Sequence, residues 1–296
     1  MSVNELIAGD LIRKVRKIQI RTSHVVDDLL AGGWHSAFKG RGIEFEEVRP
    51  YQNGDDVRSI DWNVTARAGE PFIKLFREER ELSVILLVDA SASLLFGSQD
   101  QTKQQLVTEL AATLAFSAIK NQDKVGLTLF SDTVETSLPP RKGVNDVLRL
   151  IRTLLLYQAK RKGTDLNAAL EHLNRTTKRK CVVFLLSDFQ DSGYEKNLRI
   201  TATRHDVIPI VVTDLREQLL PSVGLLRLRD AETGDMRWFD TSSRTHRVLF
   251  QQAVERKRQQ RDALFKKLGL RSIGLSTSED YVEPLRRFFR MREGRS

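Results

Sequence analysis

The chain has 296 residues, of which 40% are hydrophobic and 29% are charged, an ordinary composition for a globular protein. This length is enough for one large core and a smaller satellite region. The single cysteine, Cys181, lies in an apolar run and cannot form an internal disulfide, so we expect a small core side chain. No apolar run approaches the roughly 18 residues needed to cross a bilayer. Basic residues from Arg13 to Lys17 stand where a secretory signal would be apolar, so we expect a cytoplasmic protein.

The net charge of +9 is concentrated in the last part of the chain, because residues 215–296 carry 18 basic and 11 acidic side chains. The densest stretch is Glu255-Arg256-Lys257-Arg258-Gln259-Gln260-Arg261. Phosphate neutralisation needs such clusters, so a nucleic-acid-binding protein that uses this C-terminal third is an alternative function. No aromatic residues are interleaved there to stack on bases, which favours a solvated helical surface instead.

Residues 1–81 are predicted to form a first region, with a helix over 4–30 followed by short strands and turns over 40–82. Asn53-Gly54-Asp55 is a strong turn signal. Aspartates 55, 56 and 61 lie close in sequence to arginines 49, 58 and 67, so we expect structural ion pairs there.

Residues 82–296 are predicted to form an α/β domain with a doubly wound, mainly parallel sheet, because apolar strands alternate with amphipathic helices. The patterns predict strands over 83–89, 124–130, 181–187, 207–212 and 270–275, and helices over 100–120, 144–156, 194–204, 243–268 and 279–292. A further helix follows Thr164, and a short hairpin arm follows residue 132. Residues 219–240 depart from the alternation and indicate a hairpin insertion with its turn at Thr233-Gly234-Asp235. The apolar face of the closing helix, with Tyr281, Leu285, Phe288 and Phe289, is typical of core packing.

The apolar strand 83–88 ends in a carboxylate that is followed by hydroxyls at alternate positions, Asp89, Ser91 and Ser93. Ligands of open α/β sheets bind beyond the carboxyl ends of the strands, so these three side chains are expected to share one crevice. Thr164, before a helix, and Asp188, at the end of another apolar strand, can complete the oxygen set. Few carboxylates and several hydroxyls favour Mg²⁺, with Mn²⁺ or Ca²⁺ as alternatives.

Asp89-x-Ser91-x-Ser93, Thr164 and Asp188, in this order, resemble the metal-ion-dependent adhesion site of von Willebrand factor A domains. The resemblance implies that Ser91 and Ser93 bind the ion directly and that Thr164 does so in a conformation-dependent way. It implies that Asp89 and Asp188 act through water, and that an acidic side chain of a partner takes the open coordination position.

A second resemblance covers most of the chain. The run from Gly40 to Trp62, the stretch Phe76-Arg77-Glu78-Glu79-Arg80-Glu81 and the tail from Thr277 to Phe289 are similar to the bacterial family called domain of unknown function 58. The resemblance implies a von Willebrand A-like domain that acts with a MoxR-type AAA+ ATPase. The expected role is that of an adaptor or co-chaperone in maturing protein complexes.

We expect no enzymatic activity. A nucleophilic serine needs a base and an oxyanion hole, and the five histidines (24, 35, 172, 205 and 246) show no pairing with Ser91 or Ser93 in the sequence. A metal-dependent hydrolase remains as a less favoured alternative, since such sites usually use histidines or several carboxylates.

Overall fold

The structure is a computed structural model that describes residues 43–78, 82–98, 101–157 and 163–293, together with residues 15, 18, 22, 25, 26 and 34 of the N-terminal segment. Most of the helix predicted over 4–30 lies outside the described residues. In the described part of the chain, no helix is both long and apolar enough to cross a membrane.

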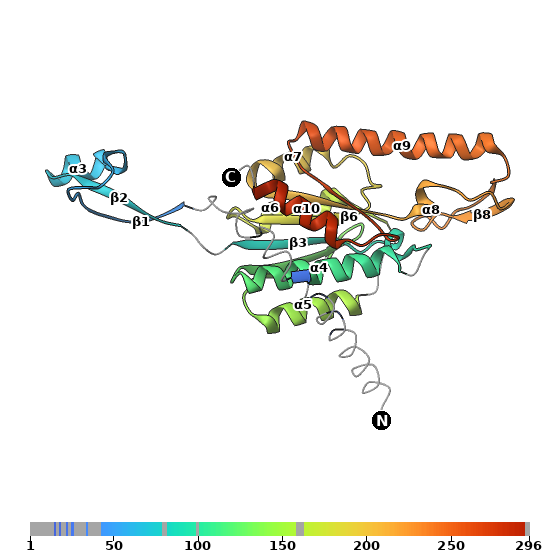
Figure 1. The fold of residues 1–296 in the computed structure, drawn as a ribbon, viewed down its shortest axis with the longest axis horizontal. Coiled ribbons are helices and arrows are strands. Elements are labelled where there is room, and N and C mark those ends of the chain that lie inside the picture. The colour runs from blue at the N-terminus through green and yellow to red at the C-terminus, as the bar shows by residue number, and fades with distance from the viewer. Residues whose placement is uncertain are drawn as a thin grey trace, which may run out of the picture.

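A six-stranded sheet forms the centre of the molecule, in the order β10-β7-β6-β3-β4-β5 (Figure 1). The strands are β3 (Ser83–Asp89), β4 (Lys124–Phe130), β5 (Val134–Arg141), β6 (Val182–Ser187), β7 (Asp206–Thr213) and β10 (Ile273–Ser276). All neighbours run parallel except β4 and β5, which are antiparallel. The predicted doubly wound, mainly parallel fold is therefore confirmed.

Helices cover both faces of this sheet, which is why the central strands β3 and β6 are made almost entirely of apolar residues. One face packs against α4 (Lys103–Lys120), α5 (Val144–Leu156) and α10 (Val282–Glu293). The other packs against α6 (Leu166–Thr176), α7 (Glu195–Arg204) and α9 (Arg244–Lys267), as Figure 1 shows. All six residues of β6 are buried, as a central strand between two helical layers requires.

The closing helix α10 buries its apolar face in the core, as predicted, with Leu285 and Phe289 fully inaccessible. Trp34 from the N-terminal segment joins the same core. Its ring centroid lies 5.1 Å from that of Phe289, and its indole Nε1 donates to a carboxylate oxygen of Asp123 at 3.3 Å. Part of the first region therefore packs on the α/β body.

From residue 43 onward, the described part of the first region contains an antiparallel pair, β1 (Ile43–Pro50) with β2 (Phe72–Glu78), which extends away from the sheet in Figure 1. Between the two strands lie a 3₁₀ turn, η1 (Val57–Ser59), and a helix, α3 (Trp62–Ala68), where the sequence pattern predicts short strands and turns. The predicted boundary between residues 81 and 82 adjoins residues 79–81, which lie outside the described part, so the division into two domains stays a prediction.

The predicted ion pairs of this region form only in part. Arg49 and Asp55 make a two-point pair with both distances at 2.8 Å. Asp56 instead caps η1, and Asp61 caps α3 by accepting from two backbone N–H groups and pairs with Lys74 at 3.4 Å. Helix capping, which satisfies free N–H groups, takes two of the three carboxylates.

The segment after β7 begins with the short helix α8 (Leu215–Gln218) and continues as an antiparallel hairpin, β8 (Leu225–Arg229) with β9 (Met236–Asp240). The hairpin packs on α9, since the ring centroids of Phe239 and Phe250 are 6.1 Å apart.

Candidate metal centre

The sheet reverses its direction of winding next to β3, which pairs with β4 on one side and with β6 on the other. Such a switch point opens a crevice at the carboxyl ends of the strands. Asp89 is the last residue of β3, and Asp188 follows the last residue of β6. The fold thus brings the two predicted aspartates to one edge of the sheet.

Asp89 organises the turn that follows β3. Its Oδ1 accepts from the backbone N–H of Ser91 at 2.9 Å, and its Oδ2 accepts from the hydroxyl of Ser187 at 2.6 Å. The hydroxyl oxygens of Ser91 and Ser93 lie 3.0 Å apart. The chain then forms a 3₁₀ turn, η2 (Ala92–Leu95). Asp89, Ser91 and Ser93 therefore form one cluster of oxygens, as predicted from their spacing.

The surroundings of Asp89 disfavour the ionised form of its carboxyl group. Burial raises its pKa to about 7, and the negative charge of Asp188 contributes in the same direction. The hydrogen bonds from Ser187 and Ser91 oppose this effect without cancelling it. A cation between the two aspartates would relieve it, because an opposite charge favours the ionised carboxylate.

Asp188 is held by a side chain that the sequence analysis did not identify. The ammonium of Lys103 donates to Asp188 Oδ2 at 2.9 Å and to Glu217 Oε1 at 2.7 Å. Burial disfavours the charged lysine, but the carboxylates of Asp188 and Glu217 outweigh that effect and raise its pKa. Lys103 stands in the first turn of α4, where a cation opposes the helix dipole. A lysine at this unfavourable position is the one signal in the sequence that could have identified Lys103 as part of the site.

Thr164 lies in the loop before α6. The N–H of the next residue, Asp165, donates to the carbonyl of Ser131 at 2.7 Å, which fixes this loop beyond the end of β4. The hydroxyl of Thr164 donates to Glu232 Oε1 at 2.7 Å. Glu232 belongs to the turn of the β8–β9 hairpin and feels the charge of Asp188. Thr164 therefore contacts Glu232, which lies within the electrostatic influence of Asp188 and which the sequence patterns do not single out.

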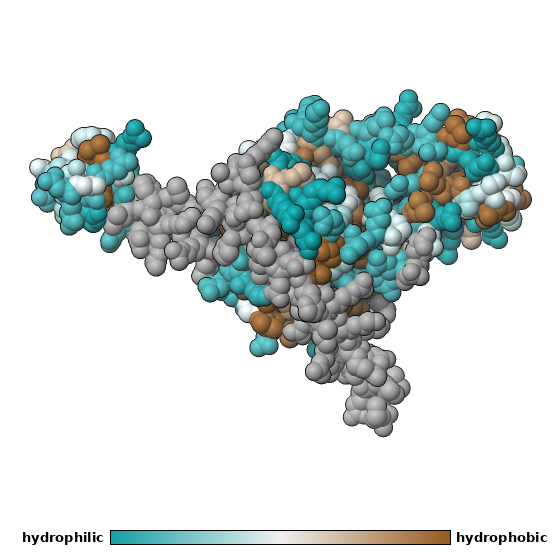
Figure 2. All heavy atoms as spheres, viewed as in Figure 1, coloured by the Kyte–Doolittle hydropathy of each residue, from teal (hydrophilic) through white to brown (hydrophobic). Residues whose placement is uncertain are grey.

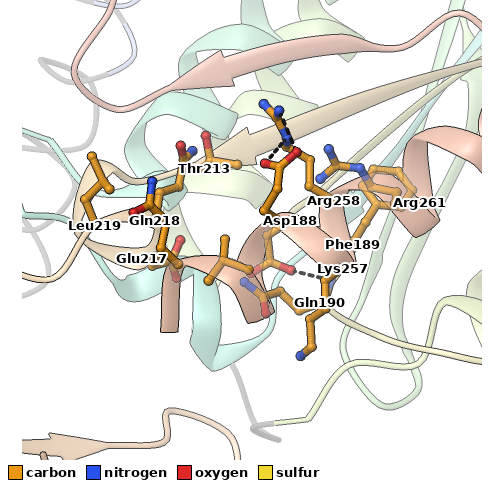
Figure 3. A pocket seen from close by; sticks show the side chains of 13 residues that line it. Asp188, Phe189, Gln190, Thr213, Glu217, Gln218, Leu219, Lys257, Arg258 and Arg261 are labelled. Atoms are coloured by element: carbon orange, nitrogen blue, oxygen red, sulfur yellow. Dashed lines mark hydrogen bonds and ion pairs between the residues drawn. The ribbon is translucent and has the colours of Figure 1, made fainter. Parts of the chain in front are cut away.

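A cleft of about 230 Å³ opens beside Asp188, between the end of β6 and helix α9 (Figure 3). Lys257, Arg258 and Arg261 from the predicted basic stretch lie on its wall. Arg258 pairs with Glu255 at 2.9 Å, and Arg261 pairs with Asp262 at 2.9 Å. Neighbouring acids therefore offset part of the charge that a nucleic acid would need.

Comparison with known proteins gives the family. The family model described as Protein of unknown function DUF58 matches residues 47–260. An uncharacterized protein of Mycobacterium tuberculosis is 33% identical over 282 residues, which cover 94% of this chain and 88% of that protein. The chain belongs to the DUF58 family. An uncharacterized protein of Mycobacterium avium is 31% identical over 160 residues, covering 53% of this chain and 94% of that protein.

Solved structures resemble this DUF58 protein only distantly. The conserved hypothetical protein BatB of Bacteroides thetaiotaomicron has a TM-score of 0.48 at 16% identity, over 73% of this chain and 100% of that chain. Proximal thread matrix protein 1 of the mussel byssus, with a zinc-occupied MIDAS motif, has a TM-score of 0.35 at 20% identity, over 45% of this chain and 38% of that chain. Neither bears on the site of this chain.

The residues present fit a divalent cation of the hard, oxygen-binding kind. Two serine hydroxyls lie side by side next to a buried carboxylate, and burial and mutual repulsion disfavour its charged form. No group of three or more His, Cys, Asp or Glu side chains suited to a metal gathers in the described ranges of this DUF58 protein. A metal here would depend on hydroxyl oxygens, which suits Mg²⁺ with retained waters. The identity of the ion and the ligand role of each residue stay predictions.

Proposed function

We propose that this DUF58 protein is a metal-dependent protein-binding module, in which Asp89, Ser91, Ser93, Thr164 and Asp188 hold a Mg²⁺ ion. The observation that carries the proposal is the pair of hydroxyls of Ser91 and Ser93, whose oxygens lie 3.0 Å apart. They stand beside Asp89, a buried carboxyl group whose pKa is raised to about 7. The bound ion would supply an accessible positive charge that attracts an acidic side chain of a client protein.

Catalysis has less support than binding. Each histidine in the described part of the chain has a hydrogen bond to a residue other than Ser91 and Ser93. His172 contacts Ser137, His205 contacts Cys181, and His246 contacts the carbonyl of Asp240. A serine hydrolase needs a base within hydrogen-bond reach of its nucleophile, and the described residues supply no histidine there. We therefore propose a role without catalysis by this chain.

A protein partner is favoured by the apolar surface near the site. Leu225 and Trp238 of the hairpin are 63% and 65% exposed, and Met236 is 49% exposed. Figure 2 shows apolar surface gathered at this end of the molecule, over the hairpin and the adjoining end of α9. Exposed apolar patches of this kind mark sites of protein interaction.

The finer part of the proposal comes from the family resemblance. We propose that the chain acts in the cytoplasm as an adaptor or co-chaperone with a MoxR-type AAA+ ATPase, during the maturation of other protein complexes. An affinity capture of the tagged chain, with Mg²⁺ or with EDTA, followed by mass spectrometry, tests this part. We expect Mg²⁺-dependent capture of an AAA+ ATPase by the wild type and none by Asp89→Asn. Capture that is equal with both additives and both proteins would contradict it.

Isothermal titration with Mg²⁺ tests the metal itself. We expect binding by the wild type, a loss of at least about ten-fold in affinity for Ser93→Ala, and a similar loss for Asp89→Asn. Ser192→Ala is the matched control, because Ser192 is exposed in the loop after β6. Affinities that are the same in all four proteins would remove the metal site and the function built on it.

A further inference from the structure

The hairpin insertion places a carboxylate at the predicted metal site. Glu232 stands in the turn between β8 and β9, far from Thr164 in the sequence, and accepts a hydrogen bond from the Thr164 hydroxyl at 2.7 Å. Thr164 is the residue for which the resemblance implies conformation-dependent binding of the ion. The contact therefore joins the hairpin to Thr164, the predicted ligand whose binding to the ion is expected to depend on conformation.

The turn that carries Glu232 is held firmly. Oδ1 of Asp230 accepts from the backbone N–H groups of both Glu232 and Thr233 at 2.9 Å. The N–H of Asp230 donates to the carbonyl of Asp235 at 2.8 Å, and Gly234 has a φ of +80°, which closes the turn. Such local carboxylate-to-backbone bonds define one turn conformation. The backbone of the hairpin turn therefore fixes the position of Glu232.

Glu232 is half-buried, and the hydroxyl of Thr164 holds its carboxylate at this edge of the sheet. Lys103 already donates to both Asp188 and Glu217. The carboxylate of Glu232 adds a further negative charge to this group, which a second cation would stabilise because opposite charges attract.

We propose that Glu232 is the chain's own acidic ligand, which takes the open position of the metal site until an acidic side chain of a partner displaces it. This inference rests on the proposed function. It means that Glu232 occupies the open coordination position in the free protein, and that a partner must move the hairpin turn to bind the ion. The partner therefore needs a carboxylate for the ion.

The test uses the full chain and Mn²⁺, whose electron spin reports the bound water molecules. The variants are Glu232→Gln, which removes the charge and keeps the shape, and Asp235→Asn, an exposed carboxylate of the same turn, as the matched control. We expect Glu232→Gln to bind Mn²⁺ roughly ten-fold more weakly and to carry about one more water on the ion than the wild type. Added acetate should displace that water in Glu232→Gln and leave the wild type unchanged. Asp235→Asn should behave as the wild type.

The outcomes separate this inference from the proposed function. If the wild type binds Mn²⁺ and Asp89→Asn does not, but Glu232→Gln has the wild-type affinity, water number and response to acetate, the metal site stands and the role of Glu232 is overturned. If Asp235→Asn changes as Glu232→Gln does, the effect belongs to the turn, and the role of Glu232 is overturned as well. If the wild type and Asp89→Asn bind Mn²⁺ equally or not at all, both proposals fail.

Discussion

The ammonium nitrogen of Lys103 lies 2.9 Å from a carboxylate oxygen of Asp188, and both side chains are almost completely buried. The cation comes from the first turn of α4, and the anion follows β6. This pair gives the predicted metal site a permanent positive neighbour. Lys103 offsets the charge of Asp188, so that a bound ion would interact with a less negative site than the acidic residues alone suggest.

Replacing Lys103 by methionine should destabilise the protein strongly. The substitution leaves Asp188 buried without its cation and removes a partner of Glu217. Breaking a buried ion pair from one side costs about 3–5 kcal/mol. We expect a loss of that size in the free energy of unfolding, measured by urea denaturation.

Lys196→Met is the matched control for this prediction, because Lys196 is exposed on α7. Its unfolding free energy should change by less than about 0.5 kcal/mol. The double variant Lys103→Met with Asp188→Asn should be less destabilised than the two single effects added together, since the residues are in contact. A Lys103→Met protein as stable as the control would contradict the importance of the pair.

The thiol of Cys181 should be unreactive in the native protein. Burial raises its pKa to about 12, with a further contribution from Asp206, so the thiol stays protonated at neutral pH. Only the thiolate reacts with disulfide reagents. Because the chain has one cysteine, a colorimetric thiol assay should show slow reaction in buffer and complete reaction in guanidinium chloride. Immediate full reaction in buffer would contradict the buried position.

Trp34→Ala should destabilise the α/β body although Trp34 belongs to the N-terminal region. Its ring packs between Phe184 and Phe289, with centroid distances of 6.0 Å and 5.1 Å. Removing a buried aromatic side chain costs about 3–5 kcal/mol. Trp62→Ala is the control, because Trp62 is 70% exposed on α3. Equal urea midpoints for the two variants would show that Trp34 does not belong to the core.

The central elements were predictable because their signals are local. Strand 124–130 and helix 144–156 match β4 and α5 at both ends, since an apolar run or a 3.6-residue period fixes each of them. The eight-residue strand β5 was expected only as a short arm. It contains Pro139 and Pro140, which argue against a strand, and it tolerates them because it lies at the sheet edge. The sequence does not predict helix α3, because the helix is short and its residues show no apolar period. Its largest apolar side chain, Trp62, is exposed.

The residues of the candidate site likewise fall into those that local sequence predicts and those that it does not. Asp89, Ser91 and Ser93 are close in sequence, so their clustering followed from one turn. Lys103 and Glu232 reach the site from an adjacent helix and a distant hairpin. Only the tertiary fold decides which side chains they contact, and no spacing in the sequence encodes those contacts.

Gly126 should be intolerant of a side chain, although it lies in the middle of a strand. A Cβ atom there would come within 3.0 Å of the carbonyl oxygen of Leu138 and of the nitrogen of Pro140, both backbone atoms of β5. Backbone atoms in a paired strand cannot move aside as a flexible side chain can. We expect Gly126→Ala to lower the free energy of unfolding by about 1–3 kcal/mol through overpacking.

Gly274→Ala in β10 separates this steric effect from the general effect of replacing a strand glycine. No atom lies within 4 Å of a Cβ built at Gly274. Both substitutions reduce the freedom of the unfolded chain equally, which by itself stabilises the protein by about 0.4–1 kcal/mol. Gly274→Ala should therefore be neutral or slightly stabilising in urea denaturation, while Gly126→Ala is destabilising. Equal effects at both glycines would mean that the close approach of β4 and β5 at Gly126 does not constrain the sheet.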